Sequence, residues 1–206
     1  MLKIINRSTN PYFNLALEEY LLKNVDADIF MLWQNRPAVI VGHNQNTWDE
    51  IDVDFVKEQK VAVVRRLTGW GAVYHDRGNL NFTFISRHRR RSGLDFAGFA
   101  SPIVETLHKL GLRAEFGGRN DIALEGRKVS GNAQYLFQGG ILHHGTLLFD
   151  TDLHHMVQAR LFRDRGDIQP GKCLVWHPLP GGRNKKSTGE SGPASLHLRH
   201  GTGCAG

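Results

Sequence analysis

The densest group of residues that could bind a ligand is a glycine-rich segment that follows two arginines. It runs from Arg65 to Asp76 and reads RRLTGWGAVYHD. Glycine allows a backbone to approach a ligand closely, and consecutive backbone N–H groups can surround an anion. The arginines supply planar, charged donors for phosphate or carboxylate, and His75 could donate to the same ligand. A hairpin turn with a surface arginine pair is the alternative, but this combination within eleven residues favours binding.

A second polar segment, residues 117–133, combines two tight turns with a lysine. Asn120 and Asp121 offer oxygen ligands that suit magnesium, which usually keeps several waters and bridges phosphates. Lys128 lies between two turn glycines at the start of an apolar stretch. Its ammonium group could neutralise negative charge that develops on phosphate or carboxylate. A β-hairpin with polar turns is the alternative, because Asn-Asp and Glu-Gly are ordinary turn pairs.

His143 and His144 are adjacent, and adjacent residues of a strand point to opposite faces. They are therefore not expected to share one metal ion, and one of them should pack or hydrogen-bond inward. Zinc is not expected in residues 1–153, which contain no cysteine and no spaced histidine pattern. The basic run from Arg87 to Arg91 is predicted to be a solvated loop, with binding to an acidic protein as the alternative.

Short apolar runs separated by turns must position these residues. Strands are expected at 29–33, 38–41, 61–65, 72–75, 81–86, 113–116, 121–124, 128–133 and 145–149, and helices at 14–24, 52–59 and 99–110. This alternation predicts an α/β or α+β domain. Trp33 and Trp48 are expected in the core or in a pocket wall.

Composition and charge change after Leu153. Residues 1–153 hold 18 Lys+Arg and 17 Asp+Glu, a net charge of +1, whereas residues 154–206 hold 8 and 3, a net charge of +5. Residues 154–206 also contain nine Gly, four Pro and both cysteines, so this segment is predicted to be disordered or loosely attached. The basic charge therefore gives little support for nucleic-acid binding by the first 153 residues.

The chain contains no apolar run of membrane-spanning length, and its start does not read as a cleavable signal segment. We therefore expect a cytoplasmic protein without a membrane partner.

Several motifs occur together in a characteristic order. They are NLALEE (14–19), GHNQN (42–46), RRLTGWGAVYHD (65–76), GN (78–79), GRND (118–121), RKVSGNAQ (127–134) and HHGTLL (143–148). In this order they resemble lipoate–protein ligase A over residues 1–153.

The resemblance implies a mixed β-sheet with flanking helices, as in biotin and lipoate ligases and class II aminoacyl-tRNA synthetases. It implies a reaction in which lipoate and ATP form lipoyl-AMP, followed by transfer of the lipoyl group to a lysine. The implied cofactors are ATP and Mg²⁺, with lipoate as substrate. The implied partners are lipoyl domains of 2-oxoacid dehydrogenases, the glycine-cleavage carrier protein and a separate C-terminal accessory domain.

The same resemblance assigns roles to individual residues. Lys128 would be the catalytic residue, and Asp121 would hold magnesium. The residues implied in substrate or ATP binding are Arg66, Thr68, Gly71, Ala72, Val73, His75, Asn120, Asp121, Ser130 and His144.

This sequence departs from the family pattern at two places. The family has three successive glycines where this chain has Gly69, Trp70 and Gly71, so the indole either obstructs the pocket or points away. After Leu153 the expected Lys-Gly and Ser-Val-Arg-Ser-Arg-Val-Thr-Asn elements are missing, so residues 1–153 are expected to be an incomplete catalytic domain.

Two other functions stay open. One is an octanoyl or lipoyl transferase of the same superfamily that does not use ATP. Its cysteine-dependent form is disfavoured because residues 1–153 lack cysteine. The other is an inactive ligand-binding fragment. A biotin ligase is disfavoured because the sequence has no Gly-Arg-Gly-Arg-type loop.

Overall fold

The computed structural model describes residues 1–87, 94–159, 174–175 and 197–198. Its strands are β1 (Leu2–Ile5), β2 (Ile29–Trp33), β3 (Ala38–Val41), β4 (Ala62–Arg65), β5 (Val73–His75), β6 (Asn79–Ser86), β7 (Ala114–Phe116), β8 (Asp121–Leu124), β9 (Arg127–Phe137), β10 (Gly140–Leu148), β11 (Leu174–Val175) and β12 (His197–Leu198). Its helices are α1 (Pro11–Asn24), α2 (Val53–Glu58), α3 (Phe96–Lys109), α4 (Leu153–Ala159) and the short 3-10 helix η1 (Thr47–Asp49).

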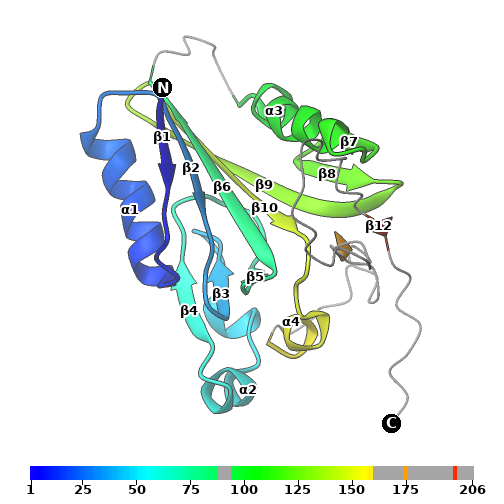
Figure 1. Ribbon diagram of the computed structural model, residues 1–206. Helices are drawn as coiled ribbons and strands as arrows, with labels where there is room; N and C mark the ends of the chain where they lie inside the picture. The colour runs from blue at the N-terminus through cyan, green and yellow to red at the C-terminus, as the bar shows by residue number, and fades with distance from the viewer. Residues whose placement is uncertain (88–93, 160–173, 176–196, 199–206) are drawn as a thin grey trace, which may run out of the picture.

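Two sheets organise the described part of the chain (Figure 1). The larger has seven strands in the order β1-β2-β6-β10-β9-β8-β7, and the smaller has the order β4-β3-β5. Each sheet contains one parallel pair, β1 with β2 and β3 with β4, and its other pairs are antiparallel. The predicted mixed α+β architecture is therefore confirmed. The strands β2, β3 and β8 have the predicted bounds, whereas β1 and α4 were not predicted.

Helix α1 packs beside β6 and β4, at the junction of the two sheets. It begins at Pro11, three residues before the predicted start at 14, because the Asn10 side chain accepts hydrogen bonds from two backbone N–H groups of the first turn. The leucines of its inner face pack against β2 in the main core. The same inner face also buries two polar residues, Asn14 and Glu18.

Strands β9 and β10 form a long hairpin that carries both the lysine segment and the histidine pair. The predicted strands at 128–133 and 145–149 are too short, because Gln134 and His143 interrupt the apolar pattern expected of a strand. Both side chains are nevertheless buried. Their mutual hydrogen bond allows the strands to continue through these polar positions.

His143 is the inward-facing member of the histidine pair, as predicted. Its Nδ1 accepts from Gln134 Nε2 at 2.8 Å, its Nε2 donates to Asn132 Oδ1 at 3.2 Å, and its ring stacks on Phe99 with centroids 5.0 Å apart. Burial lowers the pKa of His143 to about 3, with a smaller contribution from the charge of His144. It is therefore a neutral core residue.

A second core lies between β3, α2 and α4. Met156 and Ala159 of α4 are buried in it beside Val39, and the Asp52 N–H donates to the Ala159 carbonyl at 3.3 Å. Residues 154–159 thus belong to the folded body, and the disorder predicted from residue 154 is wrong for them. The rest of the predicted tail lies outside the described residues, apart from β11 and β12.

Three further expectations have different outcomes. Trp33 is 3% exposed and belongs to the core as expected, but Trp48 is 67% exposed because it lies on the surface of η1. Arg87 donates to Asp28 and Val25, whereas the rest of the predicted basic loop lies outside the described residues. Among the residues with a described structure, no helix is long and apolar enough to cross a membrane.

Stability should fall as the pH drops below 6.5. Burial lowers the pKa values of His75 and His143 to about 3, so the unfolded chain takes up protons at a higher pH than the folded chain. The contribution is fully present above pH 6.5 and is lost towards pH 3, at about 1.4 kcal/mol per pH unit for each histidine. Urea unfolding at pH 7, 6 and 5 measures this slope.

The variant His143→Gln should show about half the slope, and the exposed His154→Gln should retain all of it. A free energy of unfolding that stays constant between pH 7 and pH 5 contradicts the burial of neutral histidines.

Candidate substrate-binding site

The glycine-rich segment folds around the guanidinium of Arg66. Arg66 is 6% exposed, and its Nε donates to Thr68 Oγ1 at 2.8 Å. Nη1 donates to the Ile40 carbonyl at 3.0 Å, while Nη2 donates to the carbonyls of Gly69 and, at 2.8 Å, Gly71. These bonds satisfy carbonyls that the turn would otherwise leave unpaired, so Arg66 sets the path of the segment. Its predicted contact with a ligand stays a prediction.

A buried polar chain links this segment to α1. Thr68 Oγ1 lies 2.8 Å from His144 Nε2, and His144 Nδ1 lies 3.1 Å from both carboxylate oxygens of Glu18. Glu18 also accepts from the Thr83 hydroxyl, which accepts from Trp33 Nε1 at 2.9 Å. An ionised carboxylate can only accept, so the ring nitrogen of His144 that faces Glu18 carries a proton.

A second polar chain reaches the other end of the glycine-rich segment. Asn6 Nδ2 donates to Asn14 Oδ1 at 2.9 Å, and Asn14 Nδ2 donates to Asn35 Oδ1 at 2.8 Å. Asn35 Nδ2 lies 3.0 Å from Nδ1 of His75. Asn14 and Asn35 are fully buried and His75 is 4% exposed, so this chain crosses the protein interior.

Both series of hydrogen bonds pass through one face of α1. Asn14 and Glu18 are four residues apart, which places them one helical turn apart on the same side. Their partners lead to Thr68 and His75, which lie on either side of the glycines. Neither Asn14 nor Glu18 was assigned a role from the sequence. The available signal was two polar residues at this spacing on a helix face rich in leucine.

The neighbouring loop at 42–47 is held by the other arginine of the pair. Arg65 Nη1 donates to the carbonyls of Gly42, His43 and Gln45 at 2.7, 3.0 and 2.8 Å. The His43 N–H in turn donates to the Thr68 carbonyl at 2.9 Å. Each arginine thus holds a separate loop, and the two loops lie side by side.

The glycines of the segment leave open space. A Cβ added to Gly69 or Gly71 would meet no heavy atom within 4 Å, whereas one added to Gly42 would lie 2.0 Å from the Trp70 carbonyl oxygen. Trp70 is 55% exposed and has a φ of 71°, a left-handed conformation that favours glycine. The indole is therefore mainly in solvent, and the backbone of the segment remains open to a ligand.

Ala72 and Val73 follow this open stretch, but their side chains are not free. Ala72 is 2% exposed in the second core, and Val73 packs against the main core. Ala72 could therefore contact a ligand only through its backbone atoms, whereas the side chain of Val73 is only partly buried.

The predicted catalytic lysine forms an ion pair on the β8–β9 hairpin. Lys128 Nζ lies 2.7 Å from Asp121 Oδ1, and their side chains are 41% and 33% exposed. A shift of register between the strands leaves Val129 without a partner, a bulge of the kind that redirects neighbouring side chains. The lysine side chain passes directly beside Gly131, where an added Cβ would lie in ordinary contact, 3.5 Å from Lys128 Cε.

The turn that carries Asp121 is attached to β9 by a pair of asparagines. Asn120 Nδ2 donates to the Asn132 carbonyl at 2.8 Å, and Asn132 Nδ2 donates to the Asn120 carbonyl at 2.9 Å. Asn132 Nδ2 also lies 3.4 Å from Ser130 Oγ, which is buried. Ser130 therefore supports the turn. Asn132 was quoted in a motif but given no role from the sequence.

A magnesium ion would find two oxygen donors here, the Asp121 carboxylate and Asn120 Oδ1. In the part of the chain that the structure describes, no group of three or more His, Cys, Asp or Glu side chains could hold a metal ion. Magnesium is commonly held by one or two carboxylates together with phosphates. The donors present fit a magnesium ion that is bound mainly through a nucleotide.

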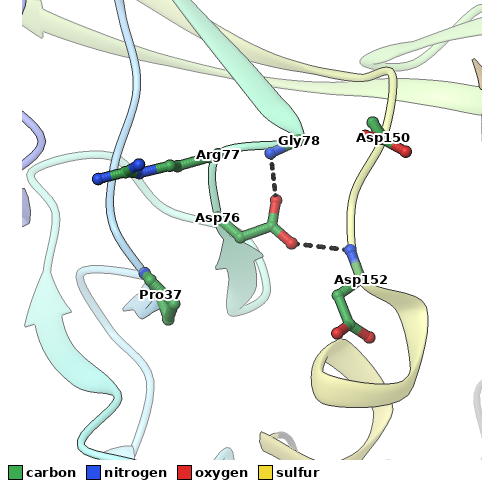
Figure 2. Close-up of a pocket in the computed structure, with 6 residues that line it drawn as sticks. All are labelled: Pro37, Asp76, Arg77, Gly78, Asp150 and Asp152. Atoms are coloured by element: carbon green, nitrogen blue, oxygen red, sulfur yellow. Dashed lines mark hydrogen bonds between the residues drawn. The ribbon is translucent and has the colours of Figure 1, made fainter. Parts of the chain in front are cut away.

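Asp76, the last residue of the glycine-rich motif, serves as an anchor (Figure 2). Its carboxylate accepts from the backbone N–H groups of Gly78 and Asp152, each at 2.8 Å. Gly78 lies against the backbone of Asp150, where a Cβ would approach its carbonyl to 2.0 Å. These residues line a surface hollow with Pro37, but none of the predicted binding residues lines it. The hollow is therefore not the candidate site.

The predicted residues thus fall into two groups. Thr68 contacts Arg66 and His144 directly, and the charges of Arg66 and His144 act on His75. The second group consists of Lys128, Asn120, Asp121 and Ser130. The paired strands β9 and β10 connect it to the first group.

Comparisons with known proteins point to one family. Residues 10–175 match the family model of the lipoyl protein ligase A/B catalytic domain. The chain is 49% identical over 162 residues to lipoate-protein ligase LplJ of Bacillus subtilis (strain 168), covering 77% of this chain and 49% of the relative.

Solved structures of similar fold include three ligases. A bi-partite lipoate protein ligase of Thermoplasma acidophilum, studied with its E2 lipoyl domain, has a TM-score of 0.72 and 28% identity over 80% of this chain and 68% of its own. P. falciparum LipL1 in complex with lipoate has a TM-score of 0.71 and 34% identity, covering 77% and 51%. A lipoate-protein ligase A bound with ATP has a TM-score of 0.69 and 28% identity, covering 78% and 71%.

The chain therefore belongs to the lipoyl protein ligase A/B catalytic domain family. It spans about half the length of the curated relatives that it matches.

Replacing Trp70 with glycine should stabilise the protein. A left-handed conformation costs a residue other than glycine about 1–2 kcal/mol, and glycine loses about 0.5–1 kcal/mol more chain entropy, so the net gain is about 0.5–1 kcal/mol. Urea unfolding measures it. The matched control is Trp48→Gly, which removes an exposed tryptophan from η1 and should not stabilise. A Trp70→Gly protein that is less stable than the original contradicts the strained conformation.

Proposed function

We propose that this chain activates lipoate with ATP and transfers the lipoyl group to a lysine of an acceptor protein. The observation that carries the proposal is the ion pair of Lys128 and Asp121, together with an open glycine-rich segment, in a chain of this family. The ATP complex and the lipoate complex of two similar ligases support both substrates.

In the first step a lipoate carboxylate oxygen attacks the α-phosphorus of ATP, and the bond to pyrophosphate breaks. The product is lipoyl-AMP. The ammonium group of Lys128 would stabilise negative charge on the carboxyl and phosphate oxygens, because it is already positioned when the charge develops. Asp121 holds this ammonium in place before the substrates bind. Magnesium, held by Asp121 and Asn120, would supply further positive charge to the phosphates.

In the second step the acceptor lysine amine attacks the lipoyl carbonyl carbon, loses a proton, and AMP leaves. The proposed acceptors are lipoyl domains of 2-oxoacid dehydrogenases and the glycine-cleavage carrier protein. The bi-partite ligase of T. acidophilum and its E2 lipoyl domain support this choice. The bi-partite nature of that ligase supports a separate accessory chain as a further proposed partner.

The variant Lys128→Ala should lower lipoylation about 10²–10³-fold, the loss typical of removing one preorganised charge or donor. Intact mass of an apo lipoyl domain, incubated with the full chain, ATP, magnesium and lipoate, measures the reaction. The matched control is Lys109→Ala, which removes an exposed lysine from α3 and should leave the rate unchanged.

Supplying synthetic lipoyl-AMP separates the two steps. Transfer from lipoyl-AMP alone means that the site is sound and that the accessory chain is required for adenylation. Transfer from an acylated carrier protein without ATP favours the transferase alternative. No mass change under any of these conditions contradicts the proposal and favours an inactive fragment.

A further inference from the structure

Among the residues that the structure describes, one buried ring nitrogen of His75 finds no hydrogen-bond partner. Its Nε2 makes no hydrogen bond with any described residue, although the side chain is only 4% exposed. Burying a polar group without a partner costs about 1–3 kcal/mol, so such atoms are uncommon in folded proteins. The other ring nitrogen, Nδ1, is bonded to Asn35.

The orientation of the asparagines determines which ring nitrogen carries the proton. Asn14 Nδ2 donates to the backbone carbonyls of Ser8 and Gln34 at 2.9 and 3.0 Å, so this amide cannot be reversed. Its Nδ2 also lies 2.8 Å from the Asn35 side chain. The two hydrogens of Asn14 are shared among these three acceptors, and reversing Asn35 would set two NH₂ groups against each other, so the Asn35 oxygen faces Asn14. Asn35 then presents its NH₂ group to His75.

This NH₂ group makes Nδ1 of His75 an acceptor. In a neutral imidazole one nitrogen accepts and the other donates, so the proton lies on Nε2. Burial, helped by the charges of Arg66 and His144, lowers the pKa of His75 to about 3. The ring therefore stays neutral and keeps the same tautomer over the physiological pH range.

His75 adjoins the candidate site, because the charges of Arg66 and His144 act on it. The His75 ring packs edge-on against Trp33, with centroids 6.0 Å apart. Trp33 in turn donates to Thr83, a member of the hydrogen-bond network that ends at Thr68. Arg66 cannot satisfy the free position, because a guanidinium only donates. The group that completes the site must therefore bring an acceptor atom.

We propose that Asn14 and Asn35 are positioning residues that hold His75 as the Nε2–H tautomer, so that this N–H donates to an acceptor atom of the acid substrate. The proposal rests on the proposed function and deepens it. The acceptor is either a carboxyl oxygen or a sulfur of the dithiolane ring.

The tautomer can be tested in the full chain without any substrate. Nitrogen-15 spectra of the histidine side chains should show His75 with an unprotonated Nδ1 and a protonated Nε2. In Asn35→Asp the carboxylate can only accept, so the proton should move to Nδ1. The exposed Asn24→Asp should leave the His75 signals unchanged. A protonated Nδ1 in the original protein overturns the proposal, even if Asn35→Asp does not fold.

Binding of lipoate tests the role of the free N–H. Adding lipoate should shift the Nε2–H signal, and Asn35→Asp should raise the KM for lipoate about tenfold, with the KM for ATP unchanged. Octanoate, which lacks sulfur, identifies the acceptor. An equal effect with both acids indicates a carboxyl oxygen, and an effect with lipoate alone indicates sulfur.

These measurements distinguish a failure of the donor role of His75 from a failure of the proposed function. If lipoate shifts the amide signals of Gly69 and Gly71 but not His75, the donor role is overturned and the proposed function stands. If lipoate does not bind at all, the proposed function fails and the donor role fails with it, whereas the tautomer measurement still reports on the asparagines.

Discussion

Two polar side chains buried on one face of α1 determine the arrangement of the candidate site. An ionised carboxylate in the interior requires partners, and Glu18 finds them in His144 and Thr83. Asn14, one turn earlier, must satisfy its amide as well, and does so through Asn35. These hydrogen bonds join the helix to the sheet and to the glycine-rich segment.

The same need to satisfy polar groups explains why the two arginines of the segment bond backbone carbonyls. Arg65 and Arg66 were expected to face a ligand, but most of their described hydrogen bonds go to backbone carbonyls. The loops are thus shaped before a substrate arrives, which reduces the entropy lost on binding. In the proposed reaction the charge would come instead from Lys128, whose Asp121 partner lies on the adjacent strand.

Much of the fold could be predicted from sequence, because apolar periodicity and turn residues mark β2, β3 and the helices α1, α2 and α3. The prediction failed where polar residues are buried, since Gln134 and His143 read as the end of a strand although they bond each other inside it. The motifs marked the segments that make up the candidate site. The network could not be predicted, because Glu18 and His144 are 126 positions apart in sequence, and only the folded sheet brings them together.

The most direct test of this account is a double-mutant cycle between Glu18 and Thr68, which do not bond each other but share His144. Urea unfolding of Glu18→Gln, Thr68→Val and the double variant measures their coupling. If α1 holds the glycine-rich segment through His144, the coupling energy should be about 0.5–3 kcal/mol, as for members of one network. Losses that add to within about 0.3 kcal/mol would contradict the account, because independent sites behave in that way.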